Sequence, residues 1–447
     1  MHQYTKEFSA NTKLALPVII GQVGQVAVGI VDNLMVGKLG AASLAAVSLG
    51  NGVFFVVMSV VLGFSMSITP LVAQFHGEKN ASQGGKVASY GLLLCGVIGV
   101  FLFAVIKIIQ RFIYHFNQPE EVVFLAMPYL SVIAISMIPY ALYQGAKQFS
   151  DGMSLTKLSM IATMIGNVVN VLLNYMLIFG KWGSPELGVT GAAIGTLVSR
   201  ILMFVALYIL IVKQKELKNY LSLPKPSKFD WFQIKRLLKL GFPIALQLLF
   251  EFAFFTMSIF MAGSLSVNAQ AANQIALNFA SLTFMVAVGY GVAATIRVGN
   301  QLGKKDIPNM IRISKSILLL TAMIQLVFGI LFIFIRHWIP TLYVEEVEVI
   351  TIAAQLLFIV ALFQLSDGLQ VTLLGSLRGL LDVKVPTAIL FVAYWIIGFP
   401  LMYLLSKVFN LGALGIWIAL FTGLTISCIL LFFRYDLLSK KYKEQLL

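Results

Sequence analysis

Three acidic side chains lie inside long apolar stretches of this chain, namely Asp32, Glu251 and Asp367. Each stretch is long enough to cross a membrane as a helix. A carboxylate at the centre of such a helix costs about 2.5–3.5 kcal/mol on insertion scales, and a residue of this kind usually faces a cavity or an ion pathway. Structural hydrogen bonding is the alternative. The positions favour a site that binds a metal cation or a proton.

The kind of cation follows from the neighbouring ligands. Hard oxygen ligands that include one or two carboxylates suit a small cation that must also leave. Gln247 and Ser258 share a helix face with Glu251, and Gln364 shares one with Asp367. A proton would need only one buried acid. We therefore favour Na⁺ bound by Glu251 and Asp367 over H⁺, and we expect no resident cofactor.

A second group of polar residues surrounds Asp32. Gln25 precedes it on the same helix face. Three polar side chains of later stretches lie at a similar depth, counted at about 1.5 Å per residue from the ends of those stretches. This set would form an all-oxygen site for a cation or a proton, and its members are Asn170, Asn174 and Thr196.

Other polar residues inside the apolar stretches leave two explanations open. Gln274 and Asn278 share a helix face and are counted as supporting polar residues, although Asn and Gln stripes also form plain helix-to-helix hydrogen bonds. Arg200 lies in mid-stretch, where it either makes a structural ion pair or carbonyl clamp or takes part in ion coupling. Cys95 and Cys428 are expected in the core, because their spacing fits no metal site or disulfide framework.

The composition assigns the chain to the integral membrane proteins. Of its 447 residues, 59% are hydrophobic and only 11% are charged, whereas soluble proteins average about 25% charged residues. The mean hydropathy is +0.91. The net charge of +14 does not indicate nucleic-acid binding, because the basic residues lie between the apolar stretches. Membrane lipid is an expected partner, and we expect a monomer.

Twelve apolar stretches predict an all-α integral membrane fold with 12 transmembrane helices. No segment between them is large enough to form a soluble domain. The stretches cover residues 14–36, 48–74, 87–110, 123–143, 158–179, 188–213, 236–262, 271–297, 313–335, 349–374, 385–407 and 412–434.

The twelve stretches divide into two related halves. Pro17 falls on Pro243 when the halves are aligned, and several later residues keep the same separation, which we call the repeat spacing. The segment GAKQFSDG resembles SLRGLLDV, which pairs Lys147 with Arg378. Six spans followed by six predict two six-helix bundles related by a pseudo-two-fold axis along the membrane normal, with a cleft between them. The expected domains are a first bundle over residues 1–213, a linker over 214–235 and a second bundle over 236–447.

The distribution of basic residues fixes the expected orientation. Most of the 32 Lys and Arg fall in the segments on the same side as the N-terminus, which is the pattern of cytoplasmic segments. Both termini are therefore expected in the cytoplasm, and a prokaryotic inner membrane is the expected location.

Several motifs together resemble those of the multidrug and toxic compound extrusion (MATE) family, closest to its NorM-like branch. The resemblance covers nearly the whole chain. The matching stretches are VDNLMVGKLG at 31–40, NVVNVLLNYMLIFG at 167–180, LFEFAFF at 249–255, FQLSDGLQ at 363–370 and GSLRGLLDVKVP at 375–386.

The resemblance implies a V-shaped pair of six-helix bundles that extrudes organic cations and drugs in exchange for Na⁺ or H⁺ by alternating access. Glu251 and Asp367 match the family's cation-site acids in the second bundle, and Asp32 matches its acid in the first bundle. The family has a tyrosine where this chain has Phe363, so that contact with the cation is expected to be absent or altered. The residues matched around the first-bundle acid are Asn170, Asn174 and Thr196.

Other classes of membrane protein fit the sequence less well. A lipid-processing enzyme would need clustered acids or a phosphate site at a membrane face, and the acids here are single and scattered, so we expect no enzyme. A flippase or exporter of a lipid or a lipid-linked precursor is the nearest alternative, but it would need several basic residues in its cavity. An ATP-driven pump would need a GxxxxGK[ST] loop, which this sequence lacks.

Overall fold

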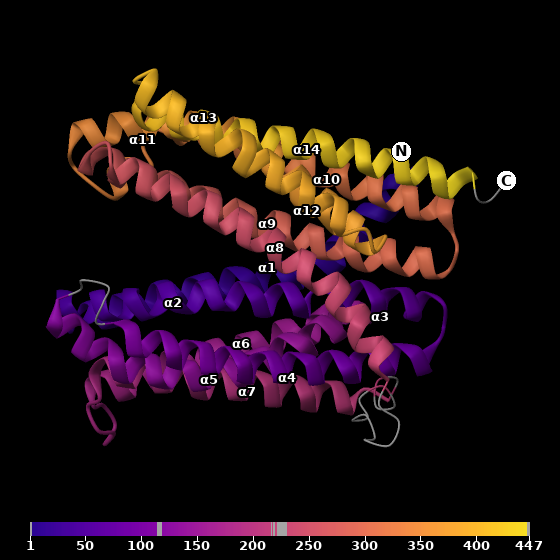
Figure 1. Cartoon of the computed structure of the whole chain (residues 1–447), viewed down its shortest axis with the longest axis horizontal. Coiled ribbons are helices and arrows are strands. Elements are labelled where there is room, and N and C mark those ends of the chain that lie inside the picture. The colour runs from indigo at the N-terminus through magenta and orange to yellow at the C-terminus, as the bar shows by residue number, and fades with distance from the viewer. Residues whose placement is uncertain (1, 114–118, 216, 218–219, 221–229, 445–447) are drawn as a thin grey trace. The chain divides into compact units, whose positions relative to one another are not determined.

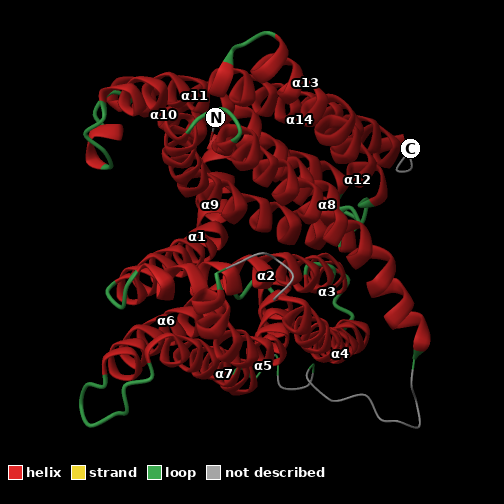
Figure 2. Ribbon diagram, turned by 60° about the vertical axis from the view of Figure 1, so that its left-hand side comes forward, coloured by secondary structure: helices red, strands yellow, loops and turns green. Residues whose placement is uncertain are grey.

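The computed structural model describes residues 2–113, 119–215, 217, 220 and 230–444. These residues form helices and connecting turns, with no strand among them, as Figure 2 shows. Twelve helical segments are long and apolar enough to cross a membrane. The prediction of an all-α fold with twelve spans is therefore confirmed.

The helices follow one another in two similar series (Figure 1). The first series is α1 (His2–Gly37), α2 (Ala41–Ser65), α3 (Ile68–Gly77), α4 (Ala81–Phe112), α5 (Glu120–Gly152), α6 (Thr156–Phe179) and α7 (Gly188–Lys213). The second is α8 (Trp231–Gly263), α9 (Val267–Gly303), α10 (Ile307–Ile335), η3 (Pro340–Leu342), α11 (Val347–Gly379), α12 (Lys384–Phe391), η4 (Val392–Gly398), α13 (Phe399–Tyr403), η5 (Leu404–Val408) and α14 (Gly412–Glu444).

Each predicted stretch corresponds to one span, but many helices are longer than the apolar core that revealed them. The helix of the first stretch extends from residue 14 back to His2, and the last extends from 434 to Glu444. The second span is broken between α2 and α3, and the eleventh contains the π-helical turns η4 and η5. Hydropathy shows only the part of a helix that lies in lipid, so polar extensions and local changes of helix type escape it.

The chain packs into two units. The first unit comprises residues 20–245, and the second comprises residues 1–19 together with 246–447. The two boundaries are one repeat spacing apart, and each falls just after the proline inside α1 or α8, Pro17 or Pro243. Each half of the repeat thus gives the start of its first helix to the other unit. The expected domains 1–213 and 236–447 do not include this exchange of helix starts. Most of the expected linker over 214–235 lies outside the described residues.

The helices α5 and α11 occupy equivalent central places in their units. In the first unit α5 packs against α2, α4 and α7, and in the second unit α11 packs against α9, α10 and α14. Both helices therefore bury more of their length than most of their neighbours. A polar side chain on α11 is enclosed by protein on several sides, which matters for Asp367.

Backbone details confirm the repeat. Lys79 and Lys305 both adopt a left-handed conformation, with φ of 56° and 58°, and each precedes the residue that caps the next helix. Those caps are Asn80 and Asp306, whose side chains accept hydrogen bonds from the backbone three residues later. Both pairs keep the repeat spacing.

The repeat is shifted by one residue at the ends of α5 and α11. Gly152 and Gly379 end these helices, and a Cβ atom at either glycine would lie within about 3 Å of a neighbouring helix. Their separation exceeds the repeat spacing by a single position, and this longer spacing pairs Asp151 with Arg378. The predicted pairing of Lys147 with Arg378 is thus out of register by one helical turn. Two similar motifs can be aligned in more than one way when the ends of their helices are not known.

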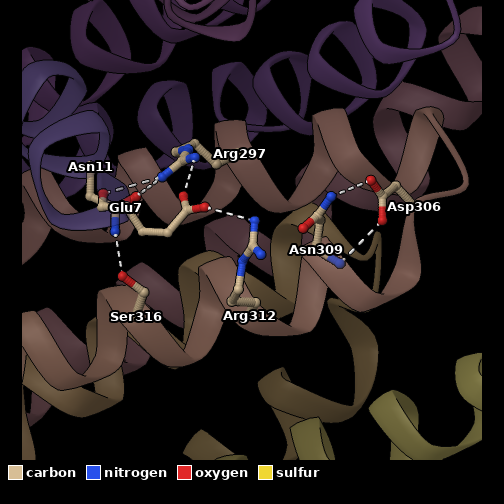
Figure 3. Close-up of polar contacts among 7 residues, drawn as sticks. All are labelled: Glu7, Asn11, Arg297, Asp306, Asn309, Arg312 and Ser316. Carbon is tan, nitrogen blue, oxygen red and sulfur yellow. Dashed lines mark hydrogen bonds and ion pairs between the residues drawn. The ribbon is translucent and has the colours of Figure 1, made fainter. Parts of the chain in front are cut away.

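The start of α1 is held in the second unit by charged side chains (Figure 3). The carboxylate of Glu7 accepts hydrogen bonds from Arg297 on α9 at 2.6 Å and from Arg312 on α10 at 3.1 Å. Asn11, one turn further along, donates to Ser316 at 3.2 Å and accepts from Arg297. The start of α1 is therefore fixed by ion pairs as well as by apolar packing.

The start of α8 makes the corresponding contact in the first unit with no ion pair within 4.0 Å among the described residues. Gln233, which follows Glu7 by the repeat spacing, donates from its amide to the side-chain oxygen of Gln83 at 3.1 Å. The guanidinium of Arg236 lies over the ring of Phe75 at 5.1 Å. The two helix starts are equivalent in the repeat but differ in charge.

Candidate functional site

The acid of the first unit lies in a chain of side-chain hydrogen bonds. Asp32 on α1 accepts a hydrogen bond of 2.6 Å from the amide of Asn174 on α6. The same amide lies 3.3 Å from the side-chain oxygen of Asn170, whose own amide donates to Thr196 on α7 at 3.5 Å. The structure thus brings together the four residues that were predicted to lie at a similar depth along their helices. Gly195 makes room for them, because a Cβ atom there would overlap Asn174 Oδ1.

Asn174 of this group and Asn167, on the same helix, each bury a polar atom. The side-chain oxygen of Asn174 and the amide nitrogen of Asn167 are buried and make no hydrogen bond among the described residues. A buried polar atom without a partner costs free energy, so the Asn174 oxygen, on the side of its amide away from Asp32, is open to a donor or a cation that enters later. Asp32 itself is only half-buried, which gives such a cation access.

Arg200 on α7 places a positive charge near Asp32. Its guanidinium donates to the hydroxyl of Ser136 at 2.5 Å and lies over the rings of Phe54 and Tyr140, at 4.1 and 5.2 Å. It makes no ion pair within 4.0 Å among the described residues, yet it is close enough to interact electrostatically with Asp32. Hydroxyl and ring contacts rather than an ion pair therefore hold Arg200.

The second unit buries two acids that interact with each other. Glu251 on α8 and Asp367 on α11 are 4% and 1% exposed, and the charge of Glu251 acts on Asp367. Both oxygens of Asp367 are buried without a hydrogen-bond partner among the described residues. Glu251 accepts one long hydrogen bond, 3.4 Å, from the amide of Gln370. A pair of carboxylates with so few donors is stable only when a cation or a proton joins it.

Sequence reasoning missed several polar residues around this pair. Gln370 lies on α11 one turn after Asp367, and its oxygen accepts from the hydroxyls of Tyr394 at 2.6 Å and of Ser427 at 2.8 Å. Arg378 lies within electrostatic range of Glu251 and donates to Gln247 at 2.9 Å. The spacing of Gln370 from Asp367 could have revealed it, whereas Tyr394 and Ser427 are isolated polar residues on other helices.

The expected neighbours of the two acids have other partners. Gln247 donates to the backbone oxygen of Val383 and to Thr387, both at 3.0 Å, and Ser258 donates to its own helix. Gln364 is fully buried, and neither its oxygen nor its nitrogen has a partner among the described residues. Of the three, Gln364 is therefore the one with a free oxygen.

The remaining supporting residues lie apart from these hydrogen bonds. Gln274 is exposed and Asn278 is half-buried, and they bond to each other at 3.1 Å on α9. Gln25 is half-buried on α1. Phe363 is 1% exposed and packs edge-on against Phe255 and Trp417, so it provides an apolar wall and no oxygen.

The donor set suits a hard cation better than a soft transition metal. Among the described residues no group of three or more His, Cys, Asp or Glu is arranged to hold a metal ion. Each unit instead offers carboxylate and amide oxygens, the ligands of hard cations.

Comparison with known proteins places the chain in a family. A family model described as MatE matches it twice, over residues 17–176 and 243–404, and the starts of the two matches are one repeat spacing apart. The multidrug resistance protein NorM of Vibrio cholerae is 33% identical over 447 residues, covering 99% of this chain and 98% of its own. MdtK of Yersinia pseudotuberculosis is 34% identical over 452 residues, with coverage of 99% and 98%.

Solved structures show the same fold. The crystal structure of a mutant Vibrio cholerae MATE transporter has a TM-score of 0.91 at 17% identity and covers 99% of both chains. An outward-facing multidrug resistance MATE family transporter has a TM-score of 0.88 at 19% identity, with coverage of 97% and 96%. The fold is that of these MATE transporters. The chain belongs to the MatE family.

Proposed function

We propose that this protein is a cation-coupled multidrug efflux antiporter that extrudes organic cations and other amphipathic toxic compounds by alternating access. One observation carries the proposal: the second unit buries two acids, Glu251 and Asp367, and both oxygens of Asp367 lack a hydrogen-bond partner among the described residues. The relatives named as multidrug resistance proteins supply the substrate class. Drug and ion would compete for overlapping negative charge, so each would expel the other.

Na⁺ is the proposed coupling ion, ahead of H⁺. The free oxygens of Asp367 and Gln364 offer the hard ligands that Na⁺ prefers, and Asp32 with Asn174 offers a second place for a cation in the first unit. The distribution of Lys and Arg supports a cytoplasmic location for both termini. The bacterial sources of the relatives support the inner membrane of a bacterial cell.

The test is drug release from proteoliposomes preloaded with a fluorescent organic cation, at constant pH and with the membrane potential collapsed. External Na⁺ should speed release by the native protein and have no effect on Glu251→Gln or Asp367→Asn, because neither variant can balance the ion. If only an external acid step speeds release, the coupling ion is the proton and the Na⁺ assignment is wrong. If neither ion speeds release, the antiport proposal fails.

A further inference from the structure

A buried hydrogen-bond network fixes the amide of Gln370 beside Glu251. The nitrogen of this amide donates to Glu251, while its oxygen accepts from the hydroxyls of Tyr394 and Ser427. All four side chains belong to the second unit; Glu251 is 4% exposed, and the other three are wholly buried. The NH₂ end of Gln370 therefore faces the carboxylate, and its oxygen faces away.

This orientation suits a carboxylate without a metal cation. The amide hydrogens carry partial positive charge, so they stabilise the negative carboxylate but would repel Na⁺ bound to it. A metal cation binds to oxygen. If the amide of Gln370 turned over about its last bond, its oxygen would face Glu251 and a bound cation, and its NH₂ group would face the two hydroxyls.

Ser427 is able to serve both orientations. It lies 2.8 Å from the backbone oxygen of Leu424 as well as 2.8 Å from Gln370 Oε1. A hydroxyl has one hydrogen and two acceptor lone pairs. With the amide turned, Ser427 would donate to Leu424 and accept from the NH₂ group of Gln370. Ser427 therefore permits the turn.

Tyr394 opposes the turn. Its hydroxyl gives the shortest bond of the network, 2.6 Å to Gln370 Oε1, and turning the amide removes that acceptor. The ring of Tyr394 is stacked on Phe254, with centroids 4.9 Å apart and planes 9° from parallel. It also lies in the π-helical turn η4 (Val392–Gly398), a feature frequently found at functional sites. Stacking and burial keep the hydroxyl in place.

We infer that Gln370 is an ion-dependent ligand in this site. Its NH₂ group stabilises Glu251 when no metal cation is bound, and its oxygen joins Glu251 in binding Na⁺ after the amide turns over. The hydrogen bond of Tyr394 sets the Na⁺ concentration at which the amide turns over, and Ser427 can hydrogen-bond to the amide in both orientations. The inference rests on the proposed function, because it needs a metal cation at Glu251 and Asp367.

The experiment measures the external Na⁺ concentration that gives half-maximal drug release, separately from the maximal rate, in the proteoliposome assay. Tyr394→Phe removes the hydrogen bond that opposes the turn and should lower the half-maximal Na⁺ concentration about threefold to tenfold. Gln370→Leu removes the oxygen ligand and should raise it about tenfold or more. Release driven by an acid step without Na⁺ should change less in both variants.

Tyr143→Phe is the matched control. By the longer spacing that relates Gly152 to Gly379, Tyr143 is the counterpart of Gln370 in the other unit. Its buried hydroxyl is hydrogen-bonded to Thr163 at 2.6 Å. This variant loses a buried tyrosine hydroxyl without touching the acid pair, so its half-maximal Na⁺ concentration should equal that of the native protein.

Three results would overturn the inference. The half-maximal Na⁺ concentration of Tyr394→Phe could stay unchanged or rise. The variants could alter only the maximal rate, which is the effect of a purely structural role. The native protein could respond to acid and not to Na⁺, since a proton needs no second oxygen ligand; that result would leave antiport itself intact. If neither ion speeds drug release by the native protein, the proposed function itself is refuted.

Discussion

The two units of this chain hold their acids in different ways. In the first unit Asp32 is half-buried, receives a short hydrogen bond from Asn174 and lies near the positive charge of Arg200. In the second unit Glu251 and Asp367 are buried together, and Asp367 has no donor among the described residues. Each unit thus sets one arginine within electrostatic range of an acid, Arg200 for Asp32 and Arg378 for Glu251, but Asp367 alone of the three acids is buried without any hydrogen-bond donor among the described residues.

Equivalent positions in the repeat show how this difference arises. With the longer spacing found at the ends of α5 and α11, Tyr140 corresponds to Asp367. Tyr140 offers its ring to the guanidinium of Arg200, and Asp367 offers a bare carboxylate. The same place in the fold therefore supports a resident cation in one unit and would attract a mobile cation in the other. A duplicated fold has acquired two different electrostatic environments.

The strongest test of this contrast removes the first acid. Asp32→Asn should leave the fold intact, because an amide can still bond to Asn174. It should nonetheless lower drug efflux by about tenfold or more, since an amide can neither balance an organic cation nor carry a proton. Drug resistance of cells that express the variant, at matched protein levels, provides the measurement. Native resistance would make Asp32 a structural residue and would leave the second unit as the sole site.

Much of the fold could be predicted from the sequence, because hydropathy and a constant spacing act over whole helices. Twelve stretches corresponded to twelve spans, and the group around Asp32 could be predicted because Asn170, Asn174 and Thr196 lie at matching depths on long helices. The network of Gln370 could not be predicted. Its members come from α11, η4 and α14 as single polar residues, and helix periodicity relates only residues on one helix.

Two other features depend on packing rather than on local pattern. The start of α1 belongs to the second unit because Glu7 meets Arg297 and Arg312 there, and such a contact leaves no periodic signal. The π-helical turn that carries Tyr394 adds one residue to a helical turn in an otherwise ordinary apolar run. The ion pairs position the start of α1, and the π-helical turn positions the hydroxyl of Tyr394. Neither feature changes the hydropathy from which the helices were predicted.

A smaller effect is expected from Arg200. If its charge balances Asp32, then Arg200→Gln makes the first site more negative, like the second. Binding of a fluorescent organic cation to the purified protein should tighten about threefold to tenfold, which corresponds to roughly 1 kcal/mol. Fluorescence polarisation at constant pH measures it. Weaker binding would mean that Arg200 supports the site through its packing against Phe54 and Tyr140.

Arg336→Gln is the control for that experiment. Arg336 also lies over a phenylalanine ring, that of Phe358, at 5.3 Å, and it follows the last turn of α10. It makes no ion pair with an acid among the described residues. Loss of this charge should leave drug binding unchanged, so a change seen only in Arg200→Gln would come from the charge near Asp32.

The smallest effect is expected where the two helix starts differ in charge. Glu7→Gln gives the start of α1 the residue that α8 has at the same repeat position, Gln233. The side chains of Glu7 and Arg297 are only 11% and 17% exposed, so this ion pair is less screened than a surface pair and its loss should cost about 1–2 kcal/mol. The thermal midpoint of the purified protein should fall by about 1–2 °C, because the unfolding entropy of a chain of this length is large.

A second, exposed ion pair is the control for Glu7→Gln. The pair of Asp436 with Lys440 has the similar length of 2.7 Å but is 45% and 68% exposed. Water and salt screen such a pair, so Asp436→Asn should shift the midpoint by less than about 1 °C. Equal shifts in the two variants would show that the ion pairs of Glu7 add nothing to the packing that holds the start of α1.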